Sequence, residues 1–99
     1  MDAPWTSGSW TVKDGMADDF IAAWRELAEW TVGQYPGSRA WLLQDRDRPQ
    51  VFLSAGPWNS DEAIATWRAS DGFQQRVARI RETLESFEAR TLDEVARAG

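Results

Sequence analysis

The sequence predicts an α+β domain with the ferredoxin-like order strand, helix, strand, strand, helix pair, strand, in which a four-stranded antiparallel sheet carries its helices on one face. Two observations support this prediction. Apolar residues recur at spacings of three and four in three segments, as amphipathic helices require. Short β-prone runs, bounded by glycine, proline and aspartate, lie between these segments. The chain has 99 residues, and we expect residues 1–99 to form a single domain.

The first third of the chain is expected to supply a strand and a long helix. Residues 1–8 are expected to form a loose arm, because proline and glycine interrupt them. Residues 9–13, SWTVK, are β-prone and predict the first strand. An aspartate–glycine turn follows, and a helix is predicted over residues 17–32. The inward face of this helix is expected to consist of Phe20, Trp24, Leu27 and Thr31.

The middle of the chain predicts a β-hairpin. Its strands are expected at residues 38–44 (SRAWLLQ) and 50–55 (QVFLSA), and the charged turn between them contains a proline that does not suit a central strand. Both strands are apolar on both sides, so the sheet of a monomer would expose large apolar side chains. We therefore expect a homodimer with two sheets packed face to face. Alternation alone leaves open which set of side chains faces the partner.

The stretch GPWNSDEAIATWRASDGF, residues 56–73, organises the second half of the chain. Ser60 is suited to cap a helix, and acidic residues follow it at the positive end of the helix dipole. A second break follows Trp67, so a short helix is expected to hold this side chain. A longer helix is predicted over residues 70–86, and a fourth strand over residues 87–95, whose Glu, Ala and Arg content also favours helix. The apolar stripe of the longer helix consists of Phe73, Val77, Ile80, Leu84 and Phe87.

The composition argues against several classes of function. The net charge is −5, so neither nucleic acid nor an anionic membrane is expected as a partner. Histidine and cysteine are absent, which removes thiolate chemistry, cysteine metal sites, the commonest general base and the usual haem ligand. No carboxylate spacing predicts a metal site. No apolar run approaches the roughly 18 residues of a membrane span, and no signal peptide is recognisable, so a cytoplasmic protein is expected.

The chain resembles the antibiotic biosynthesis monooxygenase family, whose members are dimeric α+β barrels. The resemblance extends over roughly residues 10–95, and it rests on an ordered set of short stretches rather than on one specific motif. The strongest part runs from Trp58 through Ser60 and Trp67 to Phe73. The other matching stretches are Trp10-Thr11-Val12-Lys13 with Asp14-Gly15, Phe20 to Trp24 (FIAAW), Pro36-Gly37-Ser38 and Ser70-Asp71.

The resemblance implies a ligand pocket between the sheet and the helices. The family includes cofactor-free oxygenases of polycyclic aromatic substrates and haem-degrading enzymes, and Trp67 matches a tryptophan that lines the pocket in both. The haem-degrading members need a histidine at the position where this chain has Val77. They also need an asparagine on the first strand, and the matching position here lies near Gly8, where the chain has none. No haem is therefore expected. Oxygenase members place asparagine and tyrosine around the tryptophan, where Ala63 and Phe73 stand here.

Two functions remain open from the sequence. One is a cofactor-independent monooxygenase, without metal or other cofactor, that acts on a small apolar and aromatic metabolite, with Trp67 as the catalytic-site residue. The other is a non-catalytic module that binds such a molecule in the same pocket. Aromatic residues at helical spacing also serve as core, and Tyr35, the only tyrosine, suits either a proton donor or a turn. The expected substrate-binding residues are Trp24, Trp41, Trp67, Phe73 and Val77.

Overall fold

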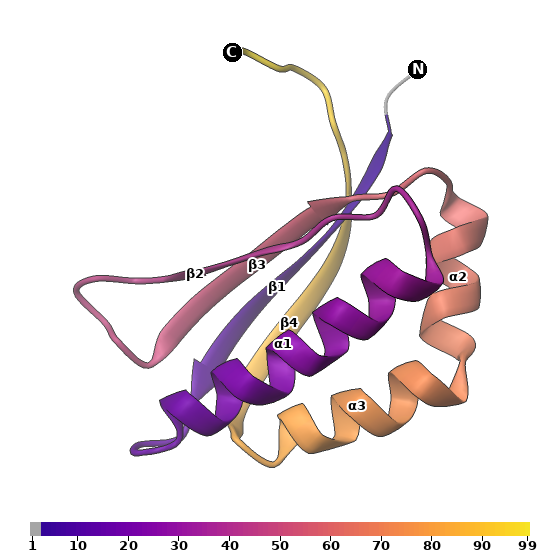
Figure 1. Ribbon diagram of the computed structural model, residues 1–99. Coiled ribbons are helices and arrows are strands. Elements are labelled where there is room, and N and C mark those ends of the chain that lie inside the picture. The colour runs from indigo at the N-terminus through magenta and orange to yellow at the C-terminus, as the bar shows by residue number, and fades with distance from the viewer. Residues whose placement is uncertain (1–2) are drawn as a thin grey trace.

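Four antiparallel strands form one layer of the protein and three helices form the other, as the computed structural model describes for residues 3–99 (Figure 1). The strands lie in the order β2-β3-β1-β4, so the two edge strands are β2 and β4. This arrangement confirms the predicted ferredoxin-like α+β fold. The elements are β1 (Pro4–Val12), α1 (Ala17–Gln34), β2 (Trp41–Gln44), β3 (Val51–Pro57), α2 (Asp61–Ala69), α3 (Asp71–Arg81) and β4 (Leu84–Asp93).

The first strand starts earlier than the sequence suggests. Residues 4–8 were expected in a loose arm, but they belong to β1 and pair with both of its neighbours: Trp5 lies opposite Pro57 of β3 and Leu92 of β4. Pro4 is the first residue of the strand, where a missing N–H is tolerated, and its carbonyl oxygen accepts a bond from the Trp58 N–H at 2.8 Å. Two strands distant in sequence thus order this segment. Residues 1 and 2 of the expected arm lie outside the described residues.

The last helix is shorter than predicted, and the last strand begins sooner. α3 ends at Arg81 because Thr83 closes it: both its N–H (2.9 Å) and its hydroxyl (2.7 Å) donate to the carbonyl oxygen of Ile80. Leu84, which was expected on the apolar stripe of a helix over residues 70–86, instead lies in β4. Phe87 was expected both at the end of that stripe and at the start of the fourth strand, and it lies in β4. Leu84 is still buried in the core, because the start of β4 packs against the same cluster as the helix.

Two serines bracket α2 as predicted. The Ser60 hydroxyl accepts a hydrogen bond from the Ala63 N–H at 3.1 Å, and the Ser70 hydroxyl accepts one from the Phe73 N–H at 3.2 Å. The Ser70 hydroxyl also donates to the carbonyl oxygen of Trp67 at 2.8 Å. A serine cap of this kind contributes about 1 kcal/mol. The two caps therefore hold α2, and with it Trp67, at a defined place between β3 and α3.

The core fills the sheet–helix interface at the end where β1 finishes and α1 begins. Phe20 of α1 packs against Trp10 of β1 and Phe52 of β3, with ring centroids 5.6 and 4.9 Å away. Val12 and Ile80 are fully buried beside them. Burial of such side chains stabilises a fold by about 1.5–3 kcal/mol each. This end of the molecule is closely packed, and the space between sheet and helices lies toward the other end.

The sheet face opposite the helices is apolar over β2 and β3. Trp10 and Phe52 lie opposite each other in the register and point to the helices, so the neighbouring residues of each strand point away from them. On that open face Trp41, Leu43 and Leu53 are 45%, 63% and 52% exposed. None of the helices in residues 3–99 has the length and hydropathy needed to cross a bilayer.

Candidate functional site: a tryptophan-lined cavity

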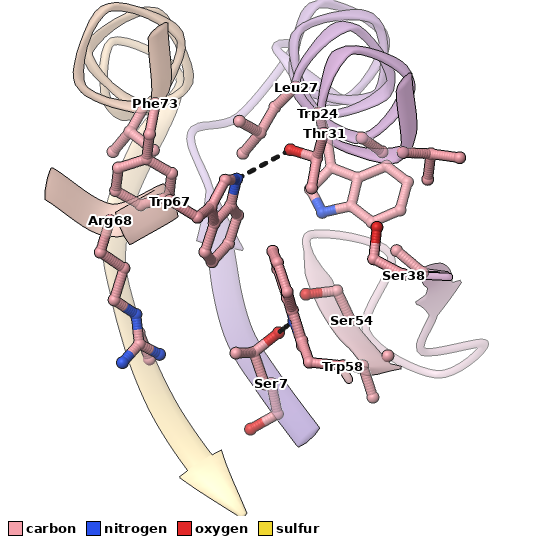
Figure 2. A pocket seen from close by; sticks show the side chains of 18 of the residues that line it. Ser7, Trp24, Leu27, Thr31, Ser38, Ser54, Trp58, Trp67, Arg68 and Phe73 are labelled. Atoms are coloured by element: carbon pink, nitrogen blue, oxygen red, sulfur yellow. Dashed lines mark hydrogen bonds between the residues drawn. The ribbon is translucent and has the colours of Figure 1, made fainter. Parts of the chain in front are cut away.

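A cavity of ≈ 440 Å³ lies between the sheet and the helices, next to the core. β1 and β3 form its floor, α1 forms one wall, and α2 and α3 form the other (Figure 2). Its volume falls within the range of about 300–1,000 Å³ that small-molecule sites occupy in proteins. Most of the lining is aromatic or aliphatic, which suits an apolar ligand.

Four of the five residues predicted from the sequence line this cavity together. Trp24 comes from α1, Trp67 from α2, and Phe73 and Val77 from α3. Trp41 does not join them. Trp41 is paired with Ala55 in the register of β2 and β3, one position away from the residues that point to the helices, so it lies on the open face of the sheet. There its ring stacks on Trp5 with centroids 6.3 Å apart. The contact of the four lining residues with a ligand stays a prediction.

Trp67 is fixed from three directions. Its indole N–H donates to the Thr31 hydroxyl at 2.9 Å, which links α2 to α1 (Figure 2). Its ring meets Phe73 edge to face, with centroids 4.5 Å apart and planes at 62°. Trp58, buried under the cavity, contacts it at a centroid distance of 4.8 Å. The ring therefore has a set orientation and is a wall of the cavity rather than a mobile side chain.

Three hydroxyl groups in the lining are each paired with a tryptophan. Besides Thr31, Ser54 accepts a hydrogen bond from the Trp10 indole N–H and Thr6 accepts one from that of Trp58, both at 3.0 Å. None of the hydrogen bonds among residues 3–99 is donated by these three hydroxyls. Each hydroxyl already accepts a bond from an indole, so its own proton remains to be donated to an acceptor in the cavity.

These hydroxyls were missed by reasoning from the sequence. Each is separated from its tryptophan by 36, 44 or 52 residues, so no local spacing connects the partners. Thr31 was predicted on the inward face of its helix, but only as part of an apolar stripe. The available signal was the excess of tryptophan, since a buried indole N–H generally needs an acceptor.

Among residues 3–99, no carboxylate and no imidazole lines the cavity. Tyr35 does not line the cavity, and its ring packs against Trp58 with centroids 5.6 Å apart and planes at 62°. The charged side chains of the lining are arginines, including Arg68 of α2 and Arg81 at the end of α3. Within residues 3–99 no group of three His, Cys, Asp or Glu side chains is placed to hold a metal ion.

One glycine shapes the wall of the cavity nearest β2. At Gly56 of β3 the chain segment Arg39–Ala40 crosses directly over the backbone, and a Cβ atom there would overlap the carbonyl oxygen of Arg39. The crossing segment supplies part of the lining. Glycine at position 56 thus permits a close approach of two backbones that any side chain would prevent.

Fold and cavity together define a class: ferredoxin-like α+β domains with an apolar, tryptophan-walled cavity between sheet and helices. The sequence model of the antibiotic biosynthesis monooxygenase family matches residues 7–79, and the chain belongs to this family. No curated protein matches the chain.

Solved structures share the fold at low sequence identity. A variant of SnoaB, a cofactor-independent oxygenase from Streptomyces nogalater, superposes with a TM-score of 0.88 at 20% identity, covering 98% of this chain and 97% of that one. A candidate antibiotic biosynthesis monooxygenase from Caulobacter crescentus gives 0.85 at 18% identity, with coverages of 96% and 92%. Protein SO0527 from Shewanella oneidensis gives 0.81 at 24% identity, with coverages of 94% and 91%.

Proposed function

We propose that this protein is a cofactor-independent monooxygenase that oxidises a small aromatic substrate in the tryptophan-lined cavity. The observation that supports this best is the fixed aromatic wall formed by Trp24, Trp67 and Phe73 around ≈ 440 Å³ of space. Membership of the antibiotic biosynthesis monooxygenase family and the fold shared with SnoaB support it further. In this proposal Trp67 is the surface against which the substrate ring stacks, and its fixed orientation positions the reacting carbon.

The substrate itself supplies the electrons in this chemistry. An anthrone loses a proton from the ring carbon opposite its carbonyl group, and the resulting carbanion reacts with dioxygen. One oxygen atom becomes the second carbonyl of the anthraquinone, and the other leaves as water with the two hydrogens of that carbon. The cavity contributes an apolar aromatic surface that orients the carbanion for its reaction with dioxygen.

Deprotonation is expected to depend on stabilisation of the substrate anion rather than on a protein base. The chain has no histidine, and no carboxylate of residues 3–99 lines the cavity, so the proton passes to solvent. The hydroxyls of Thr6, Thr31 and Ser54 have protons to donate to the oxygen on which negative charge develops. Donors fixed in place before the reaction favour the ionised form of the substrate and lower its pKa.

Oxygen uptake tests the proposal. The protein is incubated with anthrone and a metal chelator, without added flavin or haem, and dioxygen consumption and anthraquinone formation are followed. We expect equal amounts of both, loss of turnover in Trp67→Ala, and retained turnover in Trp30→Ala, which removes a tryptophan outside the cavity. Absence of turnover across a panel of anthrones and hydroquinones would refute the proposal.

A non-catalytic binding module is the second candidate. The absence of any carboxylate or imidazole from the lining favours it, as does the apolar character of Ala63 and Phe73, where the resemblance to oxygenases predicts amide and phenol groups. Saturable binding of anthrone and anthraquinone with no oxygen consumption would identify this function.

We also propose that the protein is a homodimer joined through the open face of the sheet. Trp41, Leu43 and Leu53 form an exposed apolar patch on β2 and β3, and Trp5 of β1 stacks at its side. An interface of roughly 800 Å² on each partner, at about 25 cal/mol per Å² of apolar area, contributes tens of kcal/mol before the costs of association. Light scattering after size-exclusion chromatography is expected to give twice the 11.2 kDa chain mass, and a monomer at micromolar concentration would contradict the proposal.

A further inference from the structure

The cavity opens to solvent along the edge strand β4. Phe87 and Ala89 belong to its lining, yet both are exposed, as is every residue of β4 after Leu84. The side chains that reach across this opening from the helical layer are Arg68 and Arg81. Two guanidinium groups therefore border this edge of the cavity.

Neither guanidinium group has a carboxylate partner within the described part of the chain, residues 3–99. The ion pairs among residues 3–99 involve other arginines: Arg79 with Glu26, Arg90 with Glu88, and Arg97 with Glu94. Arg68 instead donates from Nη1 to the Thr91 hydroxyl at 2.9 Å, and Arg81 lies over the Phe87 ring at 5.2 Å from its centroid. The chain carries 16 acidic residues, and none of those within residues 3–99 lines the cavity. Positive charge is thus concentrated at the opening of a cavity in an acidic protein.

Arg68 is better placed than Arg81 to hold a ligand. It is half-buried, whereas Arg81 is exposed, and it directly follows Trp67 on α2. In Figure 2 its side chain leaves α2 beside Trp67, to the left of the indole ring, and runs along β4. Its bond to Thr91 uses one of the five N–H donors of a guanidinium, which leaves a planar pair of donors for a bidentate partner. Thr91 and Phe87 are four residues, or roughly 13 Å, apart along β4. The two arginines therefore contact the strand at different places and suit different parts of a ligand.

We propose that the natural ligand of this cavity is an aromatic carboxylate whose carboxyl group binds Arg68 at the β4 opening while its ring lies against Trp67 and Phe73. A guanidinium matches the planar geometry of a carboxylate and binds it through two parallel hydrogen bonds. The inference rests on the proposed function, because it uses the same cavity and names the class of its substrate. The inference assigns Arg68 a role in ligand specificity, which the proposed stacking of the substrate ring on Trp67 does not by itself imply.

The experiment compares two probes that differ only in charge at one substituent. Isothermal titration calorimetry measures the affinity of 2-naphthoate and of its neutral analogue 2-naphthamide for the full-length protein, for Arg68→Gln and for Arg46→Gln. Arg46 lies in the exposed turn between β2 and β3, so its replacement changes the net charge equally without touching the cavity. Thermal melting followed by circular dichroism establishes that each variant is folded.

We expect the unaltered protein to bind 2-naphthoate at least about tenfold more tightly than 2-naphthamide, as a charge-assisted pair at a partly buried site predicts. Arg68→Gln is expected to lose this factor for 2-naphthoate and to change the affinity for 2-naphthamide by less than about twofold. Arg46→Gln is expected to leave both affinities unchanged. Equal affinity for the two probes, equal weakening of both by Arg68→Gln, a loss as large in Arg46→Gln, or failure of both to bind would each overturn the proposal.

The outcome is independent of the oxygenase assay. If 2-naphthoate is preferred through Arg68 but no anthrone is oxidised, the ligand class stands and the catalytic proposal fails. If anthrone, which carries no carboxylate, is oxidised equally well by Arg68→Gln and the probes do not differ, the oxygenase stands and the carboxylate site fails.

Discussion

The hydrogen bond between Trp67 and Thr31 allows a quantitative test of how the cavity wall is held. In Thr31→Val the side chain keeps its shape but loses the hydroxyl that accepts the indole N–H at 2.9 Å. Thr31 is only 7% exposed, so the N–H is left without its partner at a largely buried position. An unpaired buried donor costs about 1–3 kcal/mol. Because the half-buried Trp67 ring borders the cavity, water can take part of the lost bond, and we expect about 1–1.5 kcal/mol of destabilisation.

A double-mutant cycle isolates this bond. Trp67→Phe removes the donor, so Thr31→Val should cost much less in that background, with a coupling free energy of about 0.5–1.5 kcal/mol. Urea unfolding of the four proteins is followed by far-ultraviolet circular dichroism at one fixed protein concentration, since the stability of an associating protein depends on concentration. The expected loss in Thr31→Val corresponds to a decrease in Tm of about 4–12 °C. If the two substitutions add to within about 0.3 kcal/mol, the bond does not hold the wall, and the proposed role of Trp67 loses its support.

Three further predictions address other parts of the fold. Gly56→Ala forces the crossing backbone segment away and is expected to destabilise the protein by about 2–4 kcal/mol in the same unfolding assay. Leu53→Asp, on the exposed apolar face, is expected to give a folded 11.2 kDa monomer in light scattering, and an unchanged mass would place the interface elsewhere. Hydrogen bonds from Arg97 and then from the Trp5 indole lower the pKa of Glu94, so the contact is fully formed above the ordinary glutamate pKa and is lost as pH falls through the lowered value. Carboxyl and indole NMR signals should therefore titrate together, and a Glu94 pKa at or above the ordinary value would contradict the assignment.

Local signals in the sequence were sufficient to predict the element order. Ser60 and Ser70 cap their helices through bonds that span three residues, and helical spacing alone places Phe73, Val77 and Ile80 on one inward face. Such interactions are contained within a few residues, so the sequence carries them directly.

The incorrect element boundaries depend on contacts between distant segments. Residues 4–8 contain proline and glycine and look irregular, but pairing with β3 and β4 on both sides makes them a central strand. At the other end, the spacing of Leu84 after Ile80 fits a continuing helix as well as a buried strand residue. Thr83 decides between the two by closing the helix.

The same distinction applies to the site. The residues on helices, Trp24 and Trp67 among them, were predicted to face inward, and they line one cavity. Trp41 was grouped with them because strand alternation gives the spacing of a face but not which face meets the helices. To predict the hydroxyl partners Thr6 and Ser54, one needs the register between β1 and β3 and the position of the loop after β3. No periodicity within one segment supplies either.

The distribution of the tryptophans gives the protein an optical property. Four of the seven indoles border the cavity, namely Trp10, Trp24, Trp58 and Trp67. Trp5 and Trp41 stack on the opposite face of the sheet, and Trp30 lies against Arg76 between α1 and α3. Because indole emission depends on the polarity around the ring, filling of the cavity and covering of the open sheet face should alter the fluorescence of separate groups of rings. Single replacements by phenylalanine would assign each spectral change to one event, so occupancy and association become measurable in the same cuvette without a label.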